Sequence, residues 1–167
     1  MSIRKIVSLV AAVAFTAVSA APAFAVTVTR ADGQPMNPNG EPFSASGITS
    51  LSKGSINASC TSTFNGTITS TGILTITSTT FAGGATCGLI SGSASSGSPW
   101  TGQADNTTQL SINNAQVNVT LLGTCGPSKV VTAWNDPSSS LTFNNAVLTP
   151  DCTVSGTVAT SPKFHVQ

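Results

Sequence analysis

The sequence has 167 residues, of which only 7% are charged, with six basic residues against five acidic ones. This balance excludes the basic patches that bind nucleic acid or anionic lipid. Solubility must then depend on serine, threonine and asparagine side chains, so we expect a neutral, hydroxyl-rich surface. Such a surface resists association poorly.

The first 25 residues have the features of a secretory signal peptide. Arg4 and Lys5 precede a short apolar run, and Ala23–Phe24–Ala25 forms an A-x-A cleavage site. We predict that residues 1–25 are cleaved and that the mature protein is secreted through the periplasm to the cell surface or beyond. No second long apolar run follows, so we expect a soluble chain without a membrane span.

Residues 26–42 differ in composition from the rest of the chain. Residues 26–29 alternate valine and threonine, as a short strand does, and residues 30–42 are rich in proline, glycine and asparagine. We predict an N-terminal strand or mobile arm here, followed by one domain over residues 43–167. A chain of this length can bury about two thirds of its unfolded surface in one domain.

The segment GTITSTGILTITSTTF, residues 66–81, carries no charge and alternates with the period of a half-buried strand. Ile68, Leu74 and Ile76 share one face, and threonines occupy the other. The break at residues 70–72 suits a three-residue hairpin loop with its glycine in the left-handed conformation. A mirror about the centre of this loop pairs Ile68 with Leu74 and Gly66 with Ile76.

The same alternation recurs in four further segments, which are separated by turn signals rich in glycine, serine and proline. They are residues 56–64, 115–123, 140–148 and 152–160. In residues 115–123, for example, Val117, Val119 and Leu121 fall on one face. Short alternating strands with regular turns predict an all-β, single-domain antiparallel β-sandwich.

All four cysteines lie in the predicted mature chain, and an even number in an exported protein indicates two disulfides. Of the three pairings, the equal spacing of 27 positions favours Cys60 with Cys87 and Cys125 with Cys152. Each bond would contribute about 3.5 kcal/mol by restricting the unfolded chain. A metal or redox thiol site is disfavoured, because no C-x-x-C motif and no histidine stand near these cysteines.

Few residues can titrate or attack near neutral pH. The one histidine, His165, lies near the C-terminus, and no Gly-x-Ser-x-Gly motif indicates a nucleophile. The acidic residues do not fall at the spacing of a catalytic pair and are interpreted as turn formers; they are Asp32, Glu41, Asp105, Asp136 and Asp151. We therefore predict a protein that is not an enzyme and has no catalytic residue, cofactor or metal.

Trp100 and Trp134 are the largest aromatic side chains, and both adjoin turn residues. Either is a candidate contact for a sugar or an apolar ligand. Packing in the core or cover for a turn is the favoured role.

Five segments form a spaced set that includes all four cysteines: CTSTFNGTI at 60–68, FAGGATCGLI at 81–90, SPWTG at 98–102, CGPSKVVTAW at 125–134 and CTVSGTVATSP at 152–162. This set resembles the PraB-type protein activators of alkane oxidation, small secreted proteins of Gram-negative bacteria, over about residues 43–162. The resemblance implies a non-enzymatic accessory protein that aids access to insoluble hydrocarbon, with a hydrophobic surface or hydrocarbon as its partner. It supplies no catalytic residues.

Two other functions remain open. Low charge, polar strands and the alternating residues 26–29, which could be donated to a neighbour, favour a self-associating subunit of a cell-surface fibre or biofilm matrix. A carbohydrate- or ligand-binding module that uses Trp100 or Trp134 is the third hypothesis.

Overall fold

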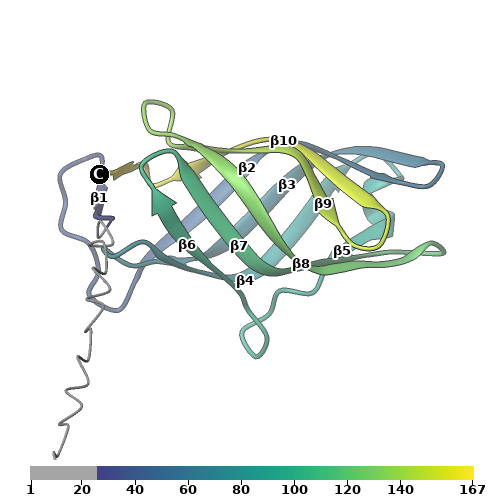
Figure 1. The fold of residues 1–167 in the computed structure, drawn as a ribbon, viewed down its shortest axis with the longest axis horizontal. Helices are drawn as coiled ribbons and strands as arrows, with labels where there is room; N and C mark the ends of the chain where they lie inside the picture. Colours follow the sequence, from purple (N-terminus) through teal and green to yellow (C-terminus); the bar gives the residue numbers. More distant parts are fainter. Residues whose placement is uncertain (1–25) are drawn as a thin grey trace, which may run out of the picture.

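The computed structural model describes residues 26–167, so the predicted signal peptide, residues 1–25, lies outside the described residues. The all-β prediction is confirmed, because the regular secondary structure of these residues consists of strands and one short 3₁₀ helix (Figure 1). The elements are β1 (Val28–Arg30), β2 (Glu41–Lys53), β3 (Ile56–Ile68), β4 (Ile73–Gly83), η1 (Cys87–Leu89), β5 (Ile90–Gly92), β6 (Trp100–Asn106), β7 (Gln109–Val119), β8 (Gly123–Asn135), β9 (Ser140–Leu148), β10 (Cys152–Ser161) and β11 (Phe164–Val166).

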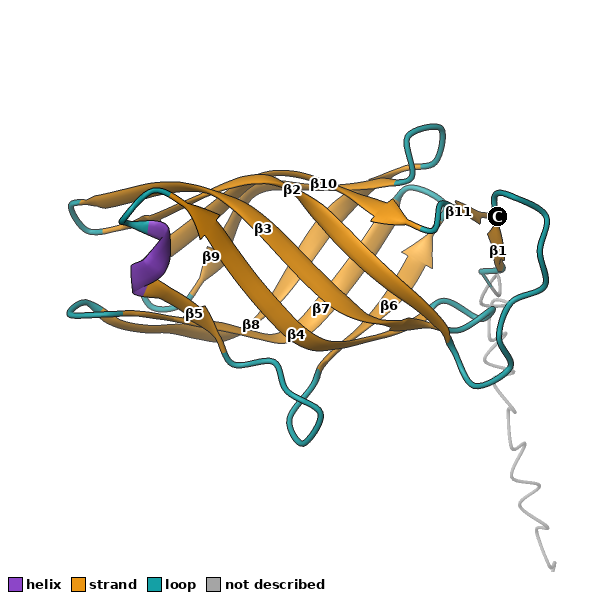
Figure 2. Cartoon of the chain, turned by 180° about the vertical axis from the view of Figure 1, so that it is seen from behind, coloured by secondary structure: helices purple, strands orange, loops and turns teal. Residues whose placement is uncertain are grey.

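Eight strands close into a barrel, which corrects the predicted β-sandwich. The wall runs in the order β7-β6-β4-β3-β2-β10-β9-β8, all antiparallel, and β8 pairs back onto β7. The strands cross the long axis at a slant in Figures 1 and 2. Alternation of apolar and polar residues could not separate the two architectures, because both place every second side chain in the core.

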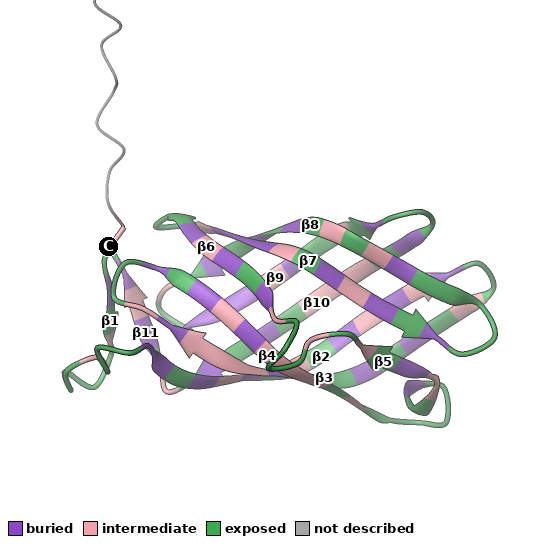
Figure 3. Ribbon diagram, turned by 90° about the horizontal axis from the view of Figure 1, so that it is seen from below, coloured by how far each residue is buried: buried purple, intermediate pink, exposed green. Residues whose placement is uncertain are grey.

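Apolar side chains fill the barrel, and hydroxyl side chains cover much of its outer face. Figure 3 shows buried and exposed residues alternating along the strands. At the centre, the ring centroid of Phe64 lies 6.0–6.4 Å from those of Phe81, Trp100 and Phe143. On the outside, hydroxyl pairs link neighbouring strands; Ser46 with Thr63 is one example, at 3.0 Å. Threonine is well suited to exposed strand positions because its branched side chain favours an extended backbone.

The hairpin predicted within residues 66–81 is confirmed. Ile68 pairs with Leu74 and Gly66 with Ile76, and the three aliphatic side chains are buried. Gly72 has a φ of +79°, which is the left-handed conformation expected at the end of the loop. The alternating pattern and the turn residues were enough to predict this register, because the two strands are neighbours in the sequence.

One end of the barrel is closed by the two-stranded sheet of β1 and β11. Val28 pairs with Val166 of the same chain, and both side chains are buried. The segment that we assigned to a strand or mobile arm therefore pairs with its own C-terminus. Arg30 binds the carboxylates of Asp32 and Glu41, and its hydrogen bond lowers the pKa of Asp32 to about 2.

Both disulfides form as favoured by the cysteine spacing, Cys60 with Cys87 and Cys125 with Cys152. Their Cα–Cα distances are 5.7 and 5.9 Å, and all four cysteines are buried. They lie toward the end opposite β1, where Cys152 pairs with Lys53 at the end of β2. Two disulfides fit an oxidising compartment outside the cytoplasm.

Within residues 26–167, no helix has the length and apolar character that crossing a membrane requires.

Candidate functional site

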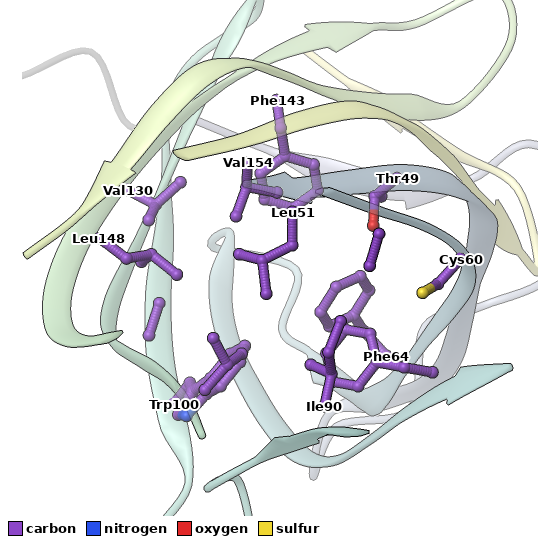
Figure 4. A pocket seen from close by; sticks show the side chains of 14 residues that line it. Thr49, Leu51, Cys60, Phe64, Ile90, Trp100, Val130, Phe143, Leu148 and Val154 are labelled. Atoms are coloured by element: carbon purple, nitrogen blue, oxygen red, sulfur yellow. The ribbon is translucent and has the colours of Figure 1, made fainter. Parts of the chain in front are cut away.

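A cavity of about 40 Å³ lies inside the barrel (Figure 4). Each strand of the wall contributes a side chain to it, and so does β5. The lining residues are Thr49, Leu51, Ala58, Cys60, Phe64, Phe81, Ile90, Trp100, Ala115, Val117, Val130, Phe143, Leu148 and Val154. The Thr49 hydroxyl and the Trp100 indole N–H are the polar side-chain groups among them, and both are already hydrogen-bonded, to Ser62 Oγ at 2.6 Å and to Ser93 Oγ at 3.0 Å. The lining therefore suits a neutral, apolar molecule.

The cavity is small for a ligand in the conformation observed. An engineered apolar cavity that binds benzene measures about 150 Å³, several times the roughly 40 Å³ found in this barrel. The present space holds a few methylene groups at most. A longer chain fits only if part of the wall moves.

The structure places both tryptophans in the interior. Trp100 is 4% exposed, borders the cavity, and donates from Nε1 to Ser93 Oγ at 3.0 Å. Trp134 is 8% exposed and lines a separate cavity of about 20 Å³ beside β11 residues. Neither ring offers an open face for a sugar to stack on. Of the two candidate ligand contacts, Trp100 is the one that borders the larger cavity.

Asp136 and His165, which are far apart in the sequence, meet at the closed end. Asp136 accepts hydrogen bonds from the Val166 backbone N–H, from Trp134 Nε1, and from His165 Nδ1 at 2.7 Å. Burial opposes ionisation of this carboxyl, but the three hydrogen bonds together hold the pKa of Asp136 below its ordinary value. The cluster ties the turn after β8 to β11, which gives both residues a structural role.

Cys125, Asp151 and Cys152 bring their ligand atoms within 4.8 Å of one another, the one such group found in residues 26–167. The two sulfur atoms form a disulfide, so no thiolate is left to bind a metal. The Asp151 carboxylate instead pairs at 2.7 Å with the buried Lys53 ammonium. This group does not fit a metal ion.

The wall is not continuously hydrogen-bonded between β4 and β5. β4 pairs with β6 from Ile73 to Ile76, and β5 pairs with β7. In the part of the chain that the structure describes, no ladder joins β4 beyond Ile76 to β5. We call residues 77–83 and 90–92 the β4–β5 seam.

Thr79 and Phe81 face inward at this seam because of a β-bulge. The register between β3 and β4 shifts after Ile76, so the inward face of β4 continues at odd-numbered residues. Phe81 reaches the cavity, and Thr79 lies against Gly92, where an added Cβ would overlap the Thr79 hydroxyl. Thr79 Oγ1 is buried and has no hydrogen-bond partner among the described residues. Sequence alternation alone did not reveal this reversal.

Several large aliphatic side chains remain exposed on the outside. The most exposed is Leu121, at 93%, and Leu122 beside it is 38% exposed. The alternation predicts that Leu121 shares one face with Val117 and Val119, and this is wrong for Leu121. β7 ends at Val119, and a tight turn follows, closed by the hydrogen bond from the Leu122 N–H to the Val119 carbonyl. We call Leu121 and Leu122 the leucine tip.

Leu121 occupies a conformation that leucine rarely adopts. Its φ is +74°, at a turn position where glycine or asparagine is preferred. For a residue with a Cβ this costs about 1–2 kcal/mol. The turn thus holds a bulky apolar side chain in water at the expense of backbone strain, which makes the leucine tip a second candidate site.

Comparison with known proteins agrees with the motifs noted in the sequence. A family model described as "Alkane oxidation protein activator PraA/PraB-like" matches residues 1–167, and the comparisons with curated proteins and with solved structures found no match. The resemblance noted over about residues 43–162 is confirmed, and the family match extends over the whole sequence. The chain therefore belongs to the PraA/PraB-like family of alkane oxidation protein activators.

Proposed function

We propose that this protein is a secreted, non-enzymatic accessory protein that aids access to insoluble hydrocarbon, at the cell surface or at an oil–water interface. The family description supports a role as an activator of alkane oxidation. A weakly charged, hydroxyl-rich exterior supports adsorption, because few charges would have to be dehydrated at an apolar boundary.

The leucine tip carries this proposal. Leu121 and Leu122 stand side by side at the turn between β7 and β8, where an apolar phase can reach them without any change of fold. Full burial of a leucine side chain contributes about 1.5–3 kcal/mol. Leu121, at 93% exposure, would contribute most of this free energy on entering an alkane phase, and Leu122, at 38%, a smaller part.

The experiment compares purified residues 26–167 with the L121N/L122N variant at a hexadecane–water interface. Asparagine tolerates positive φ, so the turn should persist while the apolar surface is lost. We expect the wild-type protein to lower the interfacial tension and the variant to need at least about tenfold more protein for the same effect, which corresponds to about 1.4 kcal/mol. The matched control is I73N, which removes a 50% exposed isoleucine at the other end of the barrel.

Two results would count against the proposal. Unchanged interfacial tension with the wild-type protein would reject adsorption. An equal loss in I73N would show that the leucine tip has no special part. Growth of a deletion strain on a long-chain alkane and on a soluble acid, with and without added protein, then tests the role in the cell.

A self-associating fibre or biofilm subunit is the alternative. In the described chain β1 pairs with β11 of the same molecule, and the barrel strands pair around a closed ring, which leaves few edges for strand exchange. We therefore rank this function second. Filaments in electron micrographs of the purified protein would reverse the ranking.

A further inference from the structure

We infer that the β4–β5 seam admits the end of an unbranched alkane chain into the barrel cavity. The choice of an alkane rests on the proposed function. The presence of an apolar chain site rests on the geometry of the cavity and the seam.

The lining selects for a neutral chain. No charged residue lines the cavity, and the Thr49 hydroxyl is occupied by Ser62. A fatty-acid carboxylate would have to enter without a cation beside it, which is unfavourable in an apolar interior. Methylene groups would meet the aromatic rings of Phe64, Trp100 and Phe143.

The seam is where the cavity lining reaches the surface. Phe81 and Val154 are the partly exposed lining residues. Val154 belongs to β10, which is hydrogen-bonded to β2 on one side and β9 on the other. Phe81 lies on the part of β4 that pairs with β3 alone, so the edge of β4 that faces the short strand β5 is unpaired there. Separation of the strands there breaks no ladder.

The residues beside the seam allow this movement. β5 has three residues, and the loop that follows it, residues 93–99, contains small residues and stands out from the wall (Figures 1 and 2). The Thr79 hydroxyl lies against Gly92 but has no hydrogen-bond partner among the described residues, so it does not tie β4 to β5. Because the closed cavity holds a few methylene groups at most, binding must shift the population toward an opened seam.

A disulfide across the seam tests this inference. The Cβ of Thr79 lies 3.1 Å from the position that a Cβ at Gly92 would take, close enough for T79C/G92C to form a bond with a small adjustment. The control is S95C/S98C, which adds a disulfide where an isolated bridge pairs these residues within the neighbouring loop. Both disulfides are made in a W134F background, so that Trp100 is the one remaining tryptophan.

The readout is quenching of Trp100 fluorescence by 1-bromododecane, a neutral chain with a heavy atom. We expect saturable quenching in the W134F protein and in the S95C/S98C control, and at least tenfold weaker quenching in T79C/G92C. Equal quenching in T79C/G92C, or no saturable quenching in the W134F protein, would overturn the inference. Displacement by dodecanoate at lower concentration than by dodecane would overturn the assignment to an alkane.

Failure here is distinguishable from failure of the proposed function. The interfacial-tension experiment depends on the leucine tip and does not involve the cavity. If the protein lowers interfacial tension but shows no saturable quenching, the proposed function is supported and the interior site is rejected. If the protein binds 1-bromododecane but leaves interfacial tension unchanged, the interior site is supported and the adsorption mechanism is rejected.

Discussion

Replacement of Phe64 by alanine should be among the most destabilising single changes in the barrel. Phe64 is 8% exposed, and three aromatic rings lie within 6.4 Å of its own. A Phe→Ala change in a core costs about 3–5 kcal/mol, because the transfer term and the new cavity add. We expect about 4 kcal/mol for F64A, since a cavity already borders the site and leaves few atoms to fill the gap. F64L should cost about 1.5 kcal/mol, because it keeps most of the apolar volume but loses the aromatic pairs.

The assay is equilibrium urea unfolding followed by far-ultraviolet circular dichroism. With a slope of about 2 kcal/mol per molar urea, F64A should lower the midpoint by about 2 M. The control is F81A, because Phe81 is partly exposed and makes a ring contact with Phe64 alone among these aromatics. F81A should therefore lower the free energy of unfolding by about 1–2 kcal/mol. A loss below about 1 kcal/mol in F64A, or a larger loss in F81A, would refute the reasoning.

Three further perturbations have defined outcomes. The C60A/C87A pair should lose about 3.5 kcal/mol of unfolding free energy in urea, because the bond closes a loop with a separation of 27. D151N should destabilise by about 2 kcal/mol, because it leaves the Lys53 ammonium buried without its carboxylate, whereas K53M should be close to neutral. The pKa of Asp136 is lowered from 3.8, so Asp136 stabilises the fold above pH 3.8, and this contribution disappears as the pH falls through the folded pKa. The Tm difference between wild type and D136N should therefore be largest at neutral pH and narrow below pH 3.8.

Each of these can fail in a recognisable way. A loss below about 1 kcal/mol for C60A/C87A would mean that the unfolded chain is already restricted. Equal effects of D151N and K53M would show that the ion pair itself, and not the burial of a lone charge, determines the stability. A Tm difference for D136N that stays constant from pH 7 to pH 2 would exclude the linkage to Asp136.

The sequence by itself predicted the all-β class, the hairpin within residues 66–81 and the pairing of the cysteines. Alternation of apolar and polar residues identified segments of β3, β4, β7, β9 and β10 but not β2 or β6, and the loop chemistry at Gly72 predicted the register of Ile68 with Leu74. Equal cysteine spacing identified both disulfides. These features can be predicted locally, because a period of two indicates a strand and a glycine in a short loop indicates a tight turn in any β-protein.

Only the tertiary structure decided closure and the candidate site. A sandwich and a barrel require the same alternation, and the difference lies in the return of β8 to β7. The bulge after Ile76 turned Phe81 inward, and the end of β7 at Val119 placed Leu121 in water. A shift of one residue reverses which face a side chain occupies, so a pattern that defines the strands cannot locate the cavity, the seam or the leucine tip.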